Sequence, residues 1–582
     1  MSIDINDMFK DKVLGHPAGL FVLFFTEMWE RFSYYGMRAL LVMFFTASLL
    51  DGGWGWPREH AYAIFGTYTS LVYLSTLLGG YFADKKIGYR YAVVIGALLM
   101  TLGHGAMAVE TPFFIYLGLT LLVFGSGFFK PNMTSIISEM YKGKDEKKDG
   151  AYTIFYMGVN AGAFLGILLC GYLGEQVGWR WGFGLAGIFM LFGLLQFWFA
   201  QNIFGDIGKK PVKVEASTIE ISADEPKLNP FTSLHLGLIA VAGLLGISWI
   251  FNDPISKISE GAYNLFDFSM FGIEGSNLAI LTALGLFVVL LGIRIPKYDR
   301  ITRDRMLAVI FFAFITIFFW AIFEQAPSSL TIFARDYTQR VLEGNAAFMF
   351  KIVNSMMTII PLGIITWVLW LLFKKTFSKY ALSNIFLAIS FIIIWGIAIW
   401  MLSMEFGKEI AEVPASWFGV LNSLFIIAFA PLFSRWWESK YNPNANMKYA
   451  IGMVLLGIGM ACVAIGASSI EPGAKTASVS MIWLILVYFF HTMGELCISP
   501  VALSYVSKLV PGRMIAMMFG IWYLAIAIGM KLAGVFGEAS EGIAETQGLS
   551  YFFWILTAVA VGLGVFSALS YPVIKKLMHG VR

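Results

Sequence analysis

The side chains best suited to chemistry lie in the first apolar stretch, where Glu27, Glu30, Arg31 and Arg38 interrupt a run of large hydrophobic residues. A charge at the centre of a bilayer costs about 2.5 kcal/mol or more, so such residues usually line a proton or substrate pathway. Glu27 lies three residues before Glu30 and four before Arg31, which places the three side chains on one face of a helix. We interpret this face as part of such a pathway; the alternative is a static buried ion pair that only fixes helix packing.

The composition is that of a helical membrane protein. Of 582 residues, 58% are hydrophobic and only 13% are charged, and the apolar runs have the length of helices rather than of the short alternating strands of an outer-membrane barrel. Cys170, Cys462 and Cys497 lie in apolar segments without metal-ligand spacing. We find no nucleophile–base set and no glycine-rich nucleotide loop. We therefore expect no catalytic residues, no metal or other cofactor, and neither nucleotide nor nucleic acid as a partner.

The apolar runs predict sixteen membrane-spanning segments, and the loops between them orient the chain. With the N-terminus inside, the inner loops hold most of the 41 lysine and arginine residues, as the positive-inside rule requires. An even number of spans places both termini in the cytoplasm. Short outer loops point to a cytoplasmic (inner) membrane. The segments are 18–47, 60–83, 91–109, 112–138, 150–175, 181–203, 234–251, 277–293, 306–329, 346–373, 382–403, 415–437, 448–467, 480–502, 514–536 and 550–573.

Further motifs accompany the charged first segment. Residues 79–90 read Gly-Gly-Tyr-Phe-Ala-Asp-Lys-Lys-Ile-Gly-Tyr-Arg, and residues 155–162 read Phe-Tyr-Met-Gly-Val-Asn-Ala-Gly. The first run resembles the loop motif of the major facilitator superfamily. The second, together with Glu27-x-x-Glu30-Arg31, resembles the signature of the proton-dependent oligopeptide transporter family. Additional matches to that family lie at 128–132, 319–325, 417–422 and 494–500, so the resemblance extends over nearly the whole chain.

The resemblance implies an all-α membrane protein with the major facilitator fold, in which two six-helix bundles surround a central cavity and expose it alternately to each side. We predict an N-terminal bundle at 1–203, a cytoplasmic linker at 204–233, an inserted helix pair at 234–305 and a C-terminal bundle at 306–582. A second inserted pair, at 346–403, interrupts the C-terminal bundle and departs from the family pattern. We expect it to pack on the outside of a bundle, where Lys351 and Asn354 have no family role.

Charged residues of the two predicted bundles lie at matching depths in the membrane. With a rise of about 1.5 Å per residue, Arg38 and Glu324 both fall in the outer parts of their segments, and Lys130 and Glu495 both fall in the inner parts. We therefore predict two ion pairs, Arg38 with Glu324 and Lys130 with Glu495, that bridge the bundles. In the family, such bridges close one face of the cavity while the other is open.

The resemblance also assigns roles. Proton coupling falls to Glu27, Glu30, Arg31 and Glu324, with Glu324 as the main proton site. Arg31 and Lys130 would bind a peptide carboxylate, and Glu495 with Asn160 and Asn422 would bind its amine and amide. The remaining predicted substrate-binding residues are Tyr35, Tyr73, Trp320, Ser499 and Trp522. For each asparagine the alternative is a structural interhelical hydrogen bond, and for each aromatic residue it is packing against lipid.

These features predict proton-coupled symport of di- and tripeptides into the cell, by a protein that works as a monomer in the lipid bilayer and is not an enzyme. Three alternatives stay open. The same fold and proton coupling could serve another small solute, such as nitrate or a peptide-like compound. The charged helix could belong to a membrane-embedded enzyme that acts on lipid-linked substrates, or to a receptor that binds peptide without transporting it.

Overall fold

Long apolar helices make up almost all of the chain, because a helix satisfies its backbone N–H and C=O groups internally where no water is available. The computed structural model describes residues 10–211, 229–509 and 515–581. Of the predicted linker, 212–228 lies outside the described residues. In the described part, fifteen helices are long and apolar enough to cross a membrane. With α2 (Ala18–Thr46), which is as long but carries the four charges, they match the sixteen predicted segments.

The first six helices pack as one bundle. α2 contacts α6 and α7, while α4 packs between α5 and α7, and α3 lies against α5. After α2 (Ala18–Thr46) follow α3 (Arg58–Phe82), α4 (Tyr89–Met107), α5 (Pro112–Met140), α6 (Asp145–Gln176) and α7 (Trp179–Ala200), with a π-helical turn at Ala83–Ile87 and 3-10 turns at Leu49–Asp51 and Gln201–Phe204.

A second bundle is built from helices of the C-terminal half. α15 packs against α16 and α18, α10 against α17, and α14 against α16. Its helices are α10 (Arg300–Phe323), α14 (Val420–Glu438), α15 (Ala445–Gly466), α16 (Ile482–Leu509), α17 (Ile515–Thr546) and α18 (Leu549–Leu569), with the short α11 (Ser329–Asp336) and α19 (Tyr571–Leu577) and 3-10 turns at Ile295–Lys297, Ala415–Gly419 and Ala467–Ser469.

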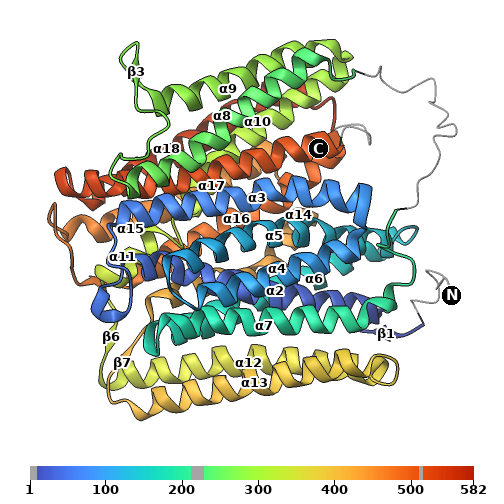
Figure 1. The fold of residues 1–582 in the computed structure, drawn as a ribbon, viewed down its shortest axis with the longest axis vertical. Helices are drawn as coiled ribbons and strands as arrows, with labels where there is room; N and C mark the ends of the chain where they lie inside the picture. Colours follow the sequence, from blue (N-terminus) through green and yellow to red (C-terminus); the bar gives the residue numbers. More distant parts are fainter. Residues whose placement is uncertain (1–9, 212–228, 510–514, 582) are drawn as a thin grey trace.

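The two bundles meet along α3 against α17 and α6 against α14. Both ends of the described chain lie at the same end of the molecule (Figure 1). Following the predicted orientation, we call this the inner end and the opposite one the outer end. The two-bundle architecture agrees with the predicted fold class, while the domain boundaries stay a prediction.

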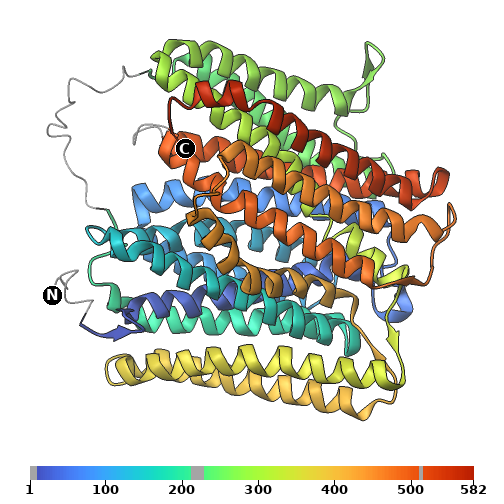
Figure 2. The same ribbon diagram turned by 180° about the vertical axis from the view of Figure 1, so that it is seen from behind.

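Two helix pairs lie on opposite flanks of the bundles in both views (Figures 1 and 2). The pair α8 (Ser233–Ile258) and α9 (Gly275–Arg294) contacts α3. The pair α12 (Gly344–Thr376) and α13 (Ala381–Gly407) belongs in sequence to the C-terminal half, yet α13 packs on α7 of the N-terminal bundle.

Short strands connect the helices. Within the described residues they form four two-stranded pairs, of which only one is parallel. The pairs are β1 (Lys12–Val13) with β2 (His16–Pro17), β3 (Ser269–Met270) with β4 (Ile273–Glu274), β5 (Thr338–Gln339) with β8 (Val479–Ser480) in parallel, and β6 (Val341–Leu342) with β7 (Ala411–Glu412).

Candidate functional site

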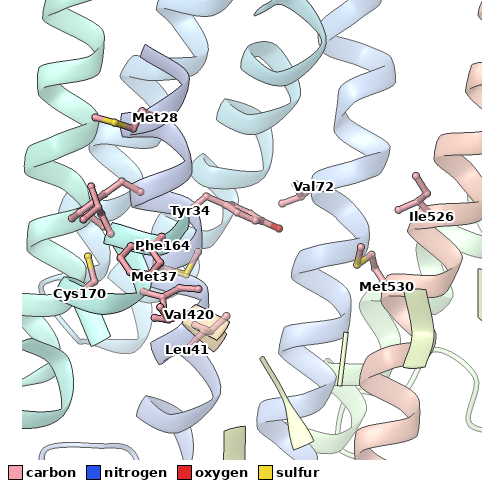
Figure 3. Packing of buried hydrophobic residues seen from close by; sticks show 14 of the residues in the cluster. Met28, Tyr34, Met37, Leu41, Val72, Phe164, Cys170, Val420, Ile526 and Met530 are labelled. Atoms are coloured by element: carbon pink, nitrogen blue, oxygen red, sulfur yellow. The ribbon is translucent and has the colours of Figure 1, made fainter. Parts of the chain in front are cut away.

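A glycine face on α6 positions the charged helix α2. Gly158, Gly162 and Gly166 recur every four residues, so they line one side of α6. A Cβ atom on Gly162 would overlap the carbonyl oxygen of Met28, and one on Gly166 would overlap that of Phe32. Close backbone approach of this kind is how small residues hold membrane helices together. Further out along the same contact, Phe164 and Cys170 of α6 lie beside Met37 and Leu41 of α2, and Tyr34 extends toward α3 (Figure 3).

The predicted charge cluster of α2 is present. Arg31 Nε lies 2.7 Å from Glu27 Oε1 and 3.1 Å from Glu30 Oε2. Both carboxylates are buried, whereas Arg31 is 14% exposed. Two acids therefore share one base, and within the described part of the chain Glu27 Oε2 and Glu30 Oε1 have no hydrogen-bond partner. Buried polar atoms usually find a partner in protein, water or ligand, so this cluster has capacity for a proton or a cationic group.

The predicted outer ion pair is also present. Arg38 Nη1 of α2 lies 2.7 Å from Glu324 Oε2, at the C-terminal end of α10. The guanidinium carbon of Arg38 also lies 4.8 Å from the ring centroid of Tyr35. Because α2 and α10 belong to different bundles, this pair joins the two halves of the molecule across the membrane interior. Its role in transport stays a prediction.

Among the described residues the predicted inner ion pair is not formed in this conformation, and its role as a bridge that closes one face of the cavity stays a prediction. Among the ion pairs of the described residues, none joins Lys130 to Glu495. Lys130 Nζ instead lies 4.1 Å from the ring centroid of Tyr34 and 5.2 Å from that of Tyr73. Glu495 Oε2 accepts a hydrogen bond from Asn422 Nδ2 at 2.9 Å. Lys130 and Glu495 lie on helices of different bundles, since α5 contacts α3 and α4 while α16 contacts α14 and α15.

The outer end of the molecule, by contrast, is closed by several polar contacts between the bundles. Arg58 Nη2 at the start of α3 lies 2.7 Å from Asp336 Oδ2. Arg335 Nη1 donates to Thr46 Oγ1 at 2.8 Å. The sequence analysis did not identify these residues, because charged residues are common near the ends of membrane segments and do not indicate a charge buried in the membrane.

A buried carboxylate makes a further outer contact. Glu175 at the end of α6 accepts hydrogen bonds from the backbone N–H groups of Ala415 and Ser416, at 2.8 and 2.9 Å, and from Ser416 Oγ. It thereby satisfies backbone donors at the start of the 3-10 turn that leads into α14, across the bundle interface. With outer contacts closed and the inner pair apart, the structure is closed at its outer end.

The remaining predicted substrate residues differ in their surroundings. Asn160 Nδ2 donates to Tyr156 O of its own helix at 2.9 Å, so this bond is neither a substrate contact nor the interhelical bond of the alternative. Trp522 is buried at 2% exposure, and Trp320 packs beside Gly529. Ser499 Oγ is buried without a hydrogen-bond partner in the described part of the chain.

His491 lies four residues before Glu495 on α16 and packs against aromatic and glycine residues. Its ring stacks on Phe323, with centroids 5.9 Å apart, and a Cβ atom on Gly459 of α15 would lie 2.7 Å from it. The imidazole therefore packs inside the C-terminal bundle, as a structural histidine does.

Among the described residues, no group of three or more His, Cys, Asp or Glu side chains could hold a metal ion.

Two six-helix bundles joined by buried charge pairs, with one end closed, define a secondary transporter of the major facilitator type. A sequence profile of the POT family (PTR2) matches residues 90–222 and 389–554. The chain belongs to this family.

Individual relatives are similar over nearly their whole length. The curated peptide transporter YePEPT of Yersinia enterocolitica is 30% identical, covering 90% of this chain and 88% of its own. The di-/tripeptide transporter of Lactococcus lactis subsp. cremoris is 28% identical, covering 98% of both chains. A crystal structure of a mutant peptide transporter POT in complex with alafosfalin superposes with a TM-score of 0.71 at 28% identity and covers all of both chains.

Proposed function

We propose that this chain imports di- and tripeptides across the cytoplasmic membrane together with protons, by alternating access of a central cavity. Its relatives are named peptide transporters and di-/tripeptide transporters. Protons would be the only co-transported species, with no bound cofactor, and the working unit would be a single chain with both termini in the cytoplasm. The relatives are transporters, and we propose no enzymatic step for this chain.

The observation that carries the proposal is the ion pair between Arg38 and Glu324, which joins the two bundles inside the membrane. An ion pair in a low-dielectric setting is strong, and neutralising one partner leaves the other charge costly to bury. A proton on Glu324 would therefore weaken the outer contact and favour opening to the outside. Glu27 and Glu30, which share Arg31, would offer a second place for the proton on the same helix.

The free charge of Lys130 supports a site for the peptide carboxylate. In this conformation the ammonium group lies against Tyr34 and Tyr73 and has no ion-pair partner in the described residues. Together with Arg31 it would bind the carboxylate, while Glu495, oriented by Asn422, would bind the amine. The two ends of a zwitterion would thus be bound by different bundles.

The aromatic residues Tyr35, Tyr73, Trp320 and Trp522 would line the space for peptide side chains, with Ser499 and Asn160 as further polar contacts. Such walls accept varied side chains because they offer area rather than a fixed hydrogen-bond pattern. The membrane potential would add about 2.3 kcal/mol per net charge per 100 mV to uptake.

Uptake of labelled dialanine into proteoliposomes tests the proposal. With the membrane potential clamped, we expect accumulation above the external concentration only when the outside is more acidic than the inside. Equal uptake with and without the proton gradient would contradict proton coupling. Binding without flux would indicate a receptor, chemical conversion of the peptide an enzyme, and competition by nitrate but not by other dipeptides a different solute.

A further inference from the structure

A second set of charges, buried or half-buried, lies outside the proposed site, where the inserted helix α8 meets the core. Lys531 of α17, whose side chain is 2% exposed, forms an ion pair with Asp253 of α8. Asp253 also lies 2.6 Å from Lys257 Nζ, one turn further along α8, and Lys257 pairs in turn with Glu538 of α17. Two cations and two carboxylates alternate, so this four-residue cluster is neutral as a whole.

The cluster also reaches the N-terminal bundle. Lys531 Nζ donates a hydrogen bond to Thr67 Oγ1 of α3 at 3.0 Å, and Thr67 Oγ1 donates to Ile250 O of α8 at 3.0 Å. One lysine therefore contacts three elements: its own bundle through α17, the other bundle through α3, and the inserted pair through Asp253. None of these residues belongs to the proposed proton or peptide site.

The backbones of α3 and α17 approach each other closely beside this lysine. A Cβ atom on Gly66 of α3 would lie 2.9 Å from Gly534 Cα and 3.1 Å from Lys531 O. At this point α3 and α17 touch backbone to backbone, which is possible only with glycine at the crossing. Any separation of the outer halves of the two bundles must part α3 from α17 close to Thr67.

We propose that Lys531 is a positioning residue of the transport cycle, and that Asp253 makes the inserted pair α8–α9 part of the transport machinery. In the outer-closed state Lys531 holds α3 and α17 together through Thr67. When the outer end opens, the contact to Thr67 is lost, and Asp253 keeps the buried ammonium group paired. This inference rests on the proposed function only in that the two bundles must move relative to each other.

The cluster is asymmetric, and that makes the inference testable. Lys531 has one carboxylate partner, whereas Asp253 has two lysine partners. Asp253→Asn therefore leaves a buried ammonium group without a counter-charge, which is costly inside a membrane. Lys531→Met leaves Asp253 paired with Lys257. The double variant Asp253→Asn/Lys531→Met removes one charge of each sign and restores neutrality.

The first experiment measures opening of the outer end without any substrate. Ala63 lies four residues before Thr67 on α3, on the same helix face, and is fully buried. In a background in which the three native cysteines are replaced, Ala63→Cys serves as the reporter, and a membrane-impermeant maleimide is added from outside. We expect Lys531→Met, and separately Thr67→Val, to raise the labelling rate about fivefold or more.

Asp267→Asn is the matched control, because Asp267 is an exposed carboxylate in the loop that joins α8 to α9. It should leave the labelling rate unchanged. Labelling as slow in Lys531→Met and Thr67→Val as in the parent would overturn the inference. Thr67→Val removes the same hydrogen bond with little change in side-chain shape. It therefore tests the inference even if Lys531→Met fails to fold.

The second experiment measures proton-driven dialanine uptake. Asp253→Asn should reduce uptake about tenfold or more, and the double variant with Lys531→Met should recover part of that loss, because it restores neutrality but not the contact to Thr67. A double variant no better than Asp253→Asn would contradict the inference. The two experiments separate the two proposals. Altered labelling of a protein that does not transport dialanine would contradict the proposed function alone. Dialanine uptake with unaltered labelling would contradict this inference alone.

Discussion

Glu324 combines two properties that proton coupling needs: it can take a proton, and it holds an arginine of the other bundle. Its side chain is buried, and the bond to Arg38 is 2.7 Å long. A protonated glutamate keeps its shape but loses its charge, so glutamine is a fair mimic of that state. In the proposed function this residue would be a single point at which protonation and bundle contact are linked.

Glu324→Gln should therefore abolish proton-driven accumulation of dialanine while leaving counterflow exchange, which needs only alternating access. We expect accumulation to fall about a hundredfold or more, to the level of the equilibrium distribution, with exchange within about threefold of the parent. Both are measured in the same proteoliposomes. Accumulation equal to the parent would refute the assignment of Glu324 as the main proton site.

Lys130→Ala should weaken peptide binding and uptake together, since Lys130 carries a cation without an ion-pair partner toward the proposed carboxylate site. Removing a charge-assisted contact of this kind costs about 1.5–3 kcal/mol, or roughly tenfold to a hundredfold in Kd. Binding is measured in detergent and uptake in vesicles. The control is Lys379→Ala, which removes a lysine that is 60% exposed and paired with Asp11; parent-like affinity in Lys130→Ala would refute its role.

At the scale of single residues, the charges in the middle of apolar runs, such as Glu27, Glu30 and Arg38, could be located from the sequence because a charge there is conspicuous. Depth, applied to the two bundles that the family resemblance implies, also predicted the Arg38–Glu324 pair. The Lys130–Glu495 pair is not formed among the described residues and stays a prediction, because depth says which charges lie at the same level and not which end of the molecule is closed. Arg58, Asp336 and Glu175 were not found, since acidic and basic residues at helix ends are common in any membrane protein.

Among elements, the contact between α2 and α6 sets where the charged helix lies. Single Gly-x-x-x-Gly matches carry little information in a chain with 59 glycines, and the sequence alone did not pick out this face. Contact with the carbonyl oxygens of α2 identifies the glycines that allow the two helices to pack closely. The neighbouring Asn160 lies on the same helix, so the motif around it serves packing as well as any binding role.

Gly162→Ala should destabilise the protein by about 1–3 kcal/mol, because the added methyl group meets the carbonyl oxygen of Met28 and must push the helices apart. Gly105→Ala is the matched control: it lies within α4 and has no atom within 4 Å of the added Cβ. Thermal unfolding in detergent compares the two. A Tm of Gly162→Ala equal to that of the control would contradict the packing described for α2 and α6.

The pair α12–α13 is peripheral by its contacts. Ser383 Oγ donates to Gln196 O at 2.9 Å, and Phe391 packs against Phe25 and Trp29 with ring centroids 5.7 Å away. The segment that leads into the pair and the segment that leads out of it run side by side as the antiparallel strands β6 and β7. Its location on the N-terminal bundle could not be predicted, because the sequence order places it in the C-terminal half.

Deleting residues 346–403 and joining the ends with a short linker should preserve transport, since the flanking strands already bring the ends together. We expect uptake within about threefold of the parent and a lower Tm, because the ring contacts of Phe391 are lost. Uptake and thermal unfolding are measured on the same preparation. A variant that folds well but does not transport would show that the pair takes part in the cycle.

For the whole molecule, the predictable part was the number of spans and the two-bundle fold, since hydropathy and motif resemblance act over the entire chain. Which end of the cavity is closed could not be predicted. In this structure the polar contacts from Arg58 to Asp336 and from Glu175 to Ser416 are made at the outer end.

The most direct test records the pH inside vesicles when peptide is added outside, with no imposed pH gradient and the potential clamped at a negative value inside. If protons and peptide cross together through exchange of charge partners between the bundles, dialanine should acidify the interior of vesicles that contain the parent chain. Vesicles that contain Glu324→Gln should show no such change. Peptide entry without acidification in the parent, or equal acidification in both, would contradict the account.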